Sequence, residues 1–347
     1  MKELKDTQLR IKHSLHFINN KARNKDINEK IHPVKPANLA KIAYEFFLKP
    51  QKNPCIKTIK SDLKKHFNPK SSSEDKLVWF GHSSYMLYFQ GKSVLVDPVL
   101  LDNVAPLPFA FKAFHGTDIY KADDFNELDY LIITHNHYDH LSKKTIKNFK
   151  HVIKKAIVPL GVGKYLNTWG INEENIIEMD WDESIDLDEN LRLHCLETKH
   201  FSGRNANDSA CSLWASFVLE NKDKKIYIGG DSGYAPHFKR IGERFKSIDL
   251  ALLENGQYSQ NWPDIHMFPH ETLQACKDLN AKALMPCHNS KFKLSFHSWD
   301  EPLEKIYTLH KALAYEFDLL TPQIGAILPL WQKIQTQTWW RELKSQA

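Results

Sequence analysis

Four side chains that can bind a metal ion lie within six residues: His135, His137, Asp139 and His140 directly follow the apolar stretch 130–134. Three imidazoles and a carboxylate gathered without a partner leave buried donors and acceptors unsatisfied, which costs free energy. A bound divalent cation removes that cost. Residues two apart at the end of a strand point to one side, and the turn that follows points elsewhere. One loop can therefore serve two adjacent ions.

Further candidate ligands follow apolar segments in the same way. Strand ends that share one edge of a sheet can converge on one crevice, so these residues can meet the first cluster. They are His200 after residues 191–196, Asp231 after residues 225–228 and His288 after residues 283–285.

The candidates divide into a three-histidine site with an open fourth position, the pattern of a catalytic zinc, and a second site beside it. Imidazole and carboxylate ligands without a thiolate suit zinc, and less specifically manganese, iron or nickel. We therefore expect two Zn²⁺ per chain. The members are His135, His137 and His200 in the first site, Asp139, His140 and His288 in the second, and Asp231 as a carboxylate able to bridge them.

Short apolar runs, typical of strands, and a few helical patterns must position these ligands. Many strands come first and helices are interspersed among the later ones, which favours a mixed α/β sandwich over a doubly wound parallel sheet. Strands are expected at 77–80, 85–89, 93–96, 130–134, 176–179, 191–196, 213–219, 225–228, 248–253, 283–285 and 324–330, and helices at 162–169, 271–279 and 301–317.

The N-terminal region differs from the rest of the chain in charge. Residues 1–70 hold 17 Lys and Arg against six Asp and Glu, although the whole 347-residue chain has a net charge of only +5. Such a region attracts an anionic partner, for example a membrane surface. The polar run 68–73 is the best boundary. We expect a basic, partly helical extension over residues 1–73 and the metal-binding domain over residues 74–347.

Within the basic region, Asn38 can cap a helix whose one face is apolar and whose flanks carry lysines. The pattern is typical of an interfacial amphipathic helix, but apolar stripes at this spacing more often pack on protein. The sequence leaves open whether residues 1–70 bind a membrane, a partner or their own domain, and it leaves the oligomeric state open, a homodimer included. The apolar face consists of Leu39, Ile42, Ala43, Phe46 and Phe47.

The overall composition narrows the class of protein. With 42% hydrophobic and 26% charged residues, the chain is globular rather than disordered. It contains no run of about 20 apolar residues that could span a bilayer and no apolar core of a secretory signal near its N-terminus. Five cysteines without a C-x-x-C pair indicate free thiols. We expect a cytoplasmic protein, with peripheral contact at the inner face of a membrane as an open alternative.

Longer motifs surround the candidate ligands: VWFGHSSYMLYFQGKSVLVDPVL early in the domain, THNHYDHL at the cluster, KHFSGR around His200, GGDSGY around Asp231 and IHMFPHET near His266. Over about residues 76–330 they resemble the metallo-β-lactamase fold hydrolases. In their detail, the motifs are similar to those of the N-acylphosphatidylethanolamine-hydrolysing phospholipase D group. Residues 261–268 and the basic region match that group only loosely. The resemblance implies an αββα sandwich of two mixed β-sheets with flanking helices, and a binuclear zinc site with the ligand sets given above.

The resemblance also implies a reaction. A zinc-dependent hydrolase of this group cleaves an N-acylphosphatidylethanolamine-type phospholipid into phosphatidic acid and an N-acylethanolamine, by attack of a hydroxide shared between the two ions. Asp139 and Asp231 would orient that hydroxide as well as bind metal. His266 would lie near the metals and bind a phosphate oxygen or protonate the leaving alkoxide. Tyr138 either points at substrate or braces its loop, and we expect His82 to orient a ligand.

Two other functions stay open. The same metals could hydrolyse a small soluble substrate in the cytosol, such as a lactone, a cyclic nucleotide or another phosphodiester. A non-catalytic membrane-binding scaffold is less favoured, because a scaffold has no need of a complete ligand set. No nucleic acid is expected as a partner, since no dedicated nucleic-acid-binding insertion interrupts the chain between His200 and His288.

Overall fold

The computed structural model describes residues 2–25, 44, 54–68, 74–101, 103–104, 111–205, 207–333 and 337–345. The amphipathic helix expected from Asn38 onward lies outside the described residues apart from Tyr44, and so do residues 69–73 of the expected boundary. Among the described residues, no helix is both long and apolar enough to cross a membrane.

Two sheets of seven strands each dominate the described part of the chain. In the first sheet, β16, β3, β4 and β5 pair antiparallel, and β5 to β8 pair parallel. Its order is β16 (Ile327–Pro329), β3 (Lys76–Trp79), β4 (Tyr85–Phe89), β5 (Lys92–Val96), β6 (Leu128–Ile132), β7 (Ile153–Pro159) and β8 (Ile176–Met179).

The second sheet repeats this plan, because β9 to β12 pair antiparallel and β12 to β15 pair parallel. Its order is β15 (Asp318–Leu319), β14 (Ala283–Cys287), β13 (Leu250–Glu254), β12 (Lys225–Ile228), β11 (Ser216–Glu220), β10 (Leu191–Leu196) and β9 (Ser184–Asp188). Each sheet therefore has a block of parallel strands whose carboxyl ends share one edge.

The central strands are buried on both faces, and their side chains alternate between two apolar clusters. In β4, Tyr85, Leu87 and Phe89 belong to the large cluster between the sheets, whereas Met86 and Tyr88 face a cluster outside the first sheet. Burial on both faces explains why these strands are near-continuous apolar runs rather than alternating ones.

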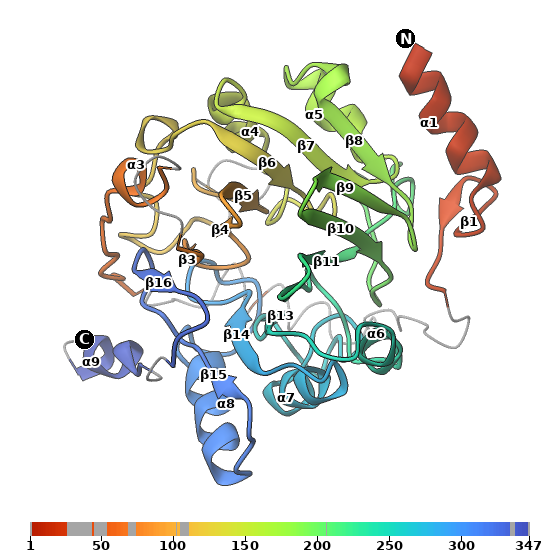
Figure 1. Cartoon of the computed structure of the whole chain (residues 1–347). Coiled ribbons are helices and arrows are strands. Elements are labelled where there is room, and N and C mark those ends of the chain that lie inside the picture. Colours follow the sequence, from red (N-terminus) through yellow and green to blue (C-terminus); the bar gives the residue numbers. More distant parts are fainter. Residues whose placement is uncertain are drawn as a thin grey trace.

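Helices cover the outer face of each sheet. Ile146 and Phe149 of α4 (Lys143–Phe149) and Leu166 of α5 (Gly163–Thr168) pack on the first sheet. The second sheet carries α6 (His237–Phe245), α7 (Pro269–Asp278) and α8 (Glu301–Ala312), whose apolar residues form a third cluster. The layers are helix, sheet, sheet and helix (Figure 1), which confirms the expected αββα sandwich. Short elements complete the fold: α3 (Leu63–His66), η3 (Ala122–Asp124), η4 (Glu173–Asn175) and α9 (Trp339–Ser345).

Most expected elements form, with differences that have physical causes. Strands 85–89, 176–179, 191–196 and 225–228 have the expected bounds, whereas β7, β9, β15, α4 and α6 were not expected. The helix expected over 301–317 is wrong at its end, because α8 stops at Ala312 and Leu313 is 58% exposed. Asp300 precedes α8 without a capping side-chain bond. The chain leaves the helix because residues 318–319 pair with β14 as a further strand.

Residues 2–25 pack on the sandwich. They form α1 (Lys2–His13), β1 (Phe17–Ile18) and β2 (Lys21–Ala22), and we call residues 2–25 the N-terminal arm. Phe17 and Ala22 are buried in the cluster between the sheets, and α1 lies beside β8 at the edge of the sandwich (Figure 1). Residues 54–68 also bury apolar side chains against the domain. The division at residue 73 stays a prediction.

Candidate metal centre

The seven predicted ligands come together at the shared edge of the two sheets. The loop after β6 supplies His135, His137, Asp139 and His140, while His200, Asp231 and His288 follow β10, β12 and β14. Their ligand atoms fall into two groups whose members lie within 4.8 Å of one another. The structure thus brings together the residues predicted to bind metal, although they follow strands that are far apart in the sequence.

The first group is a cluster of three imidazoles. His135 Nε2 lies 2.9 Å from His137 Nδ1, and His200 Nε2 lies 3.2 Å from the same atom. Tetrahedral nitrogen ligands at about 2.0–2.1 Å from a zinc ion lie ~3.3 Å apart. The spacing therefore suits three nitrogens around one ion. The carboxylate Oδ2 of Asp231 completes the group, 3.8 Å from both His135 Nε2 and His200 Nε2.

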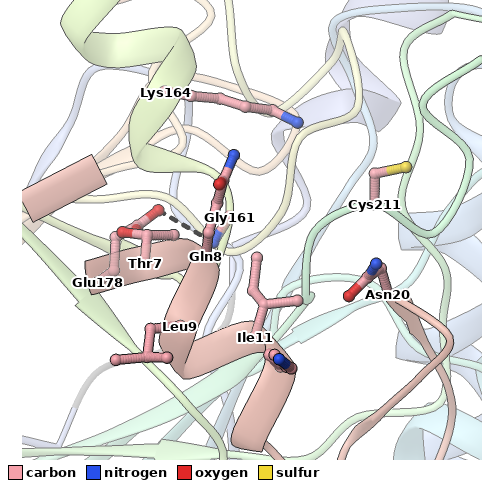
Figure 2. A pocket seen from close by; sticks show the side chains of 10 residues that line it. Thr7, Gln8, Leu9, Ile11, Asn20, Gly161, Lys164, Glu178 and Cys211 are labelled. Atoms are coloured by element: carbon pink, nitrogen blue, oxygen red, sulfur yellow. Dashed lines mark hydrogen bonds between the residues drawn. The ribbon is translucent and has the colours of Figure 1, made fainter. Parts of the chain in front are cut away.

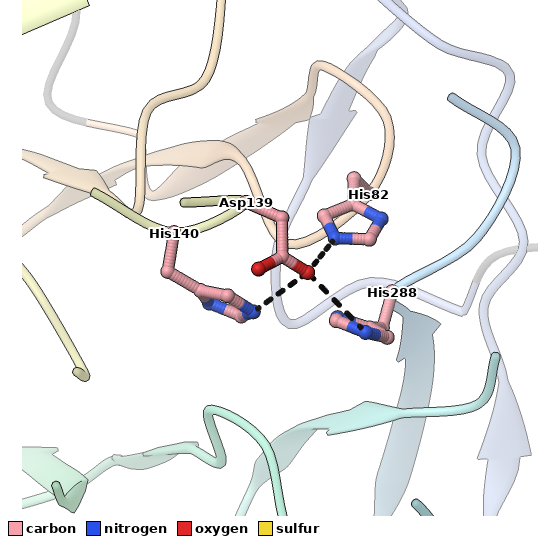
Figure 3. Close-up of side chains that lie close together, drawn as sticks. All are labelled: His82, Asp139, His140 and His288. Carbon is pink, nitrogen blue, oxygen red and sulfur yellow. Dashed lines mark hydrogen bonds and ion pairs between the residues drawn. The ribbon is translucent and has the colours of Figure 1, made fainter. Parts of the chain in front are cut away.

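The second group surrounds the carboxylate of Asp139 (Figure 3). Asp139 Oδ2 lies 3.8 Å from the Nε2 atoms of both His140 and His288. His82 Nε2 contacts the same oxygen at 3.0 Å, and its ring packs on His288 with 4.0 Å between the ring centroids. This contact agrees with the expected role of His82, which is to orient a ligand.

Asp231 lies between the two groups and presents one oxygen to each. Its Oδ1 is 3.1 Å from His140 Nε2 and 3.0 Å from His288 Nδ1, whereas its Oδ2 faces His135 and His200. A carboxylate in this position can bind two cations at once. The geometry is that of a bridging ligand, and the side chain is only 2% exposed.

The donor set fits divalent cations. His140 Nε2 and Asp231 Oδ1 lie 3.1 Å apart without hydrogen-bond geometry, and His288 Nε2 is buried without a hydrogen-bond partner among the described residues. Burial lowers the pKa values of His135 and His200 well below the usual range. Burial raises the pKa of Asp231, but His140 and His288 outweigh that effect and hold it well below its ordinary value. Neutral His135 and His200 and an ionised Asp231 have the protonation states that metal binding requires. Burial lowers the pKa of His140, but Asp231, Asp139 and Asp97 outweigh that effect and raise it, so His140 would release a proton when metal binds.

Two residues that orient the ligands were missed by the sequence reasoning. Asp97 is 0% exposed, and its Oδ2 lies 2.7 Å from His140 Nδ1. The same oxygen accepts a hydrogen bond from the Thr134 hydroxyl at 2.6 Å. Thr134 Oγ1 in turn lies 3.0 Å from His135 Nδ1. A carboxylate bonded to the far ring nitrogen fixes the orientation of a ligand histidine. Asp97 directly follows β5, so the rule that found the ligands, a polar residue at a strand end, could have found it.

Arg204 braces the loop that carries the ligand cluster. Its guanidinium donates to the carbonyl of Asn136 at 2.8 Å and to that of Leu141 at 2.6 Å. The same group stacks on the ring of Tyr138 at 4.0 Å. These contacts favour the bracing alternative for Tyr138, and its contact with substrate stays a prediction.

His266 lies beside the second group. Its Nδ1 is 2.6 Å from Glu254 Oε2 and 4.0 Å from Asp231 Oδ2. Glu254 is 2% exposed and also accepts the backbone N–H groups of Ser232 and Met267. Glu254, the last residue of β13, is a second orienting carboxylate that the sequence reasoning missed.

A buried histidine outside the ligand set gives a test of how burial in this protein changes the pKa of an imidazole. Burial, with Arg240 and Lys199 nearby, lowers the pKa of His237 to about 3. Between this value and the unfolded value near 6.5, only the unfolded chain binds the proton, so this histidine's contribution to stability falls as the pH falls. We expect urea unfolding of metal-free protein between pH 6.5 and 4.5 to lose about 1.4 kcal/mol more per pH unit than the His237→Gln variant.

The exposed His270 supplies the control for this comparison. The His270→Gln variant should follow the wild-type pH dependence, whereas equal slopes for wild type and His237→Gln would contradict the buried neutral state of His237.

Comparison with known proteins agrees with this geometry. The family model described as Beta-lactamase superfamily domain matches residues 92–289. The chain belongs to the β-lactamase superfamily. It is a metal-dependent hydrolase of the metallo-β-lactamase fold, as the sequence motifs indicated. The matched residues include the seven candidate ligands, so the site lies within the superfamily domain.

Two of the similar proteins are informative. An uncharacterized protein of Mycobacterium tuberculosis is 35% identical over 268 residues, which are 76% of this chain and 71% of that protein. N-acyl-phosphatidylethanolamine-hydrolyzing phospholipase D 1 of Caenorhabditis elegans is 27% identical over 246 residues, 67% of this chain and 69% of that protein. This second match confirms the resemblance to that group.

A solved structure supports the fold. Igni18, a metallo hydrolase from the archaeon Ignicoccus hospitalis, superposes with a TM-score of 0.55 at 19% identity, covering 75% of this chain and 99% of that one.

Proposed function

We propose that this protein is a binuclear zinc phosphodiesterase that cleaves an N-acylphosphatidylethanolamine-type phospholipid to phosphatidic acid and an N-acylethanolamine. The observation that carries the proposal is the place of Asp231, which turns one carboxylate oxygen to each of two ligand groups. The relative from Caenorhabditis elegans, whose name states this activity, supports the choice of substrate.

Zinc bound between these groups would lower the pKa of a water molecule and withdraw charge from a phosphoryl oxygen. The protein's own residues hold the ligands for that purpose. In this proposal, Asp139 and Asp231 bind the metal ions and also accept hydrogen bonds from the attacking water. Asp97 and Thr134 fix the rings of His140 and His135 through their outer nitrogens. The ligands are therefore preorganised before substrate arrives.

In this proposal His266 transfers the proton to the leaving alkoxide or binds a phosphate oxygen. Because Glu254 engages its Nδ1 at 2.6 Å, the other ring nitrogen is left to face a substrate oxygen. Glu254 would thus fix the tautomer of His266, as a buried carboxylate does for a catalytic histidine in general.

Membrane contact is the second part of the proposal. The N-terminal arm exposes Leu9, Leu15 and Ile18, with exposures of 52%, 93% and 50%. Phe201, next to the candidate ligand His200, is 37% exposed and packs on the ring of His137. Apolar side chains among the basic residues of region 1–70 match what an anionic bilayer binds.

A substrate panel tests the proposal. Zinc-loaded protein is assayed against an N-acylphosphatidylethanolamine, phosphatidylcholine, bis-p-nitrophenyl phosphate and a lactone, and its binding to anionic and neutral vesicles is measured by sedimentation. We expect the N-acylated lipid to be the best substrate, with phosphatidic acid released, and stronger binding to the anionic vesicles. Hydrolysis of the lactone alone, or no binding to either vesicle, would contradict the lipid assignment and favour a small soluble substrate.

A further inference from the structure

The peptide group of the candidate ligand His200 is held by a residue of the N-terminal arm. The side-chain Nδ2 of Asn24 donates to the carbonyl of His200 at 3.2 Å, and the His200 N–H donates to Asn24 Oδ1 at 3.2 Å. His200 is 1% exposed, and buried backbone groups need such partners. An asparagine amide offers one donor end and one acceptor end, which matches the two groups of a peptide.

The neighbours of His200 are held by the body of the domain instead. The Lys199 N–H donates to Ser232 Oγ at 3.2 Å, and the Lys199 carbonyl accepts the Gly233 N–H at 3.0 Å. Beyond His200, the Ser202 carbonyl accepts the Ala210 N–H at 2.9 Å. The arm therefore supplies the contact at the one position of this segment whose side chain points to the metal site.

Independent contacts fix the arm so that Asn24 reaches His200. The Ala22 N–H donates to the Ala210 carbonyl at 2.8 Å, and Lys21 Nζ donates to the Ser209 carbonyl at 2.6 Å. Lys25 Nζ forms an ion pair with Asp182 at 2.8 Å. These contacts lie on both sides of Asn24 in the sequence, so its position is set by the whole hairpin.

Further along the arm, α1 is tied to the edge of the first sheet. Arg10 donates to the Glu178 carbonyl at 2.8 Å and pairs with Glu183 at 2.7 Å, and Thr7 bonds the Glu178 carboxylate (Figure 2). A groove of about 840 Å³ remains between α1, the hairpin and the Gly161 turn. The arm is thus a docked element with few buried side chains, of which Phe17 and Ala22 join the cluster between the sheets.

We infer that Asn24 is a positioning residue of the metal centre, and that the docked N-terminal arm completes the three-histidine group by fixing His200. The inference rests on the metal-binding part of the proposed function, but not on its substrate. Loss of the Asn24 contacts would free the His200 peptide, and the first group would bind its ion less tightly. Residues that orient metal ligands typically contribute 10–100-fold to metal affinity.

Cobalt(II) titration of the chelator-treated, full-length protein tests the inference, because bound cobalt reports the geometry of each site in its visible absorption. We expect wild type to bind two ions per chain. Asn24→Ala should bind one of them about 10–100-fold more weakly, with a changed spectrum for that ion and the second ion unaffected. Lys25→Ala removes only a solvent-exposed ion pair, which contributes little to docking while the backbone bond from Ala22 to Ala210 remains, and it should titrate like wild type.

Three results would overturn the inference. Asn24→Ala could bind both ions with wild-type affinity and spectrum. It could weaken both ions equally together with a drop in melting temperature that Lys25→Ala shares, which is the mark of general destabilisation. If wild type itself failed to bind cobalt, the metal centre as a whole would be wrong. That result differs from one in which wild type binds cobalt and only the Asn24 assignment fails.

Discussion

Replacement of Asp231 by Asn is expected to lower the hydrolysis rate about a thousandfold or more and to reduce bound metal below two ions per chain. The substitution keeps the shape of the side chain but removes the charge that faces both ligand groups, with one oxygen 3.1 Å from His140 and the other 3.8 Å from His135. An amide cannot present two anionic oxygens to two cations. Turnover and metal content are measured on the same preparation.

Asp249 provides a matched control for this variant. It is also a buried carboxylate, paired with Lys224 at 3.2 Å and Lys282 at 2.9 Å, but it lies just before β13, at the opposite end of the strand from the metal centre. We expect Asp249→Asn to lose about 1–3 kcal/mol of stability while it keeps metal and turnover. An Asp231→Asn variant with two ions and full activity would remove Asp231 from the site.

Removal of metal by a chelator is expected to abolish hydrolysis and to destabilise the fold by about 4 kcal/mol, when measured against protein at a metal concentration about a thousandfold above the dissociation constant. The physical reason is that the buried carboxylates and imidazoles lose the cations that satisfy them. His140 Nε2 and Asp231 Oδ1 face each other at 3.1 Å without hydrogen-bond geometry, and His288 Nε2 has no hydrogen-bond partner among the described residues. Urea unfolding with and without chelator gives the difference.

Addition of metal back to the chelated protein shows which ion matters. Zn²⁺ should restore both activity and stability, whereas Mg²⁺ should restore neither, because imidazole-rich sites favour zinc over magnesium. Full activity and an unchanged unfolding midpoint in the chelated protein would contradict the metal-dependent account.

The strands were predictable where the chain is buried on both faces. Runs such as Leu250–Leu253 and Ile226–Ile228 are apolar throughout, and the buried strands β4 and β12 form at the expected bounds. The strands that the sequence did not predict have a different pattern of apolar and polar residues. In β7 the residues Lys154 and Lys155 interrupt the apolar pattern, and β9 is a partly exposed edge strand. Local pattern alone does not reveal strands that depend on pairing with a neighbour.

The candidate ligands were predictable for a simple reason: each one follows a strand, and parallel strand ends meet at one edge. The same rule, applied to every strand, would have found Asp97 after β5 and Glu254 at the end of β13. Asn24 and Arg204 are different. They act through backbone groups of His200 and of the ligand loop, and no spacing in the sequence shows which distant peptide a side chain will reach.

The basic region was interpreted from charge, and charge does not distinguish a membrane contact from packing on the domain. The arm has side chains suited to either role, because Phe17 and Ala22 are buried between the sheets whereas Leu15 is 93% exposed. Docking of the arm and contact with a bilayer are therefore compatible in one segment.

Anomalous X-ray diffraction from crystals of the zinc-loaded protein, recorded on both sides of the zinc absorption edge, locates each bound zinc ion independently of activity. We expect two anomalous peaks, one among His135, His137 and His200 and one among Asp139, His140 and His288, with Asp231 between them. A single peak, a peak distant from these side chains, or none at all would contradict this expectation.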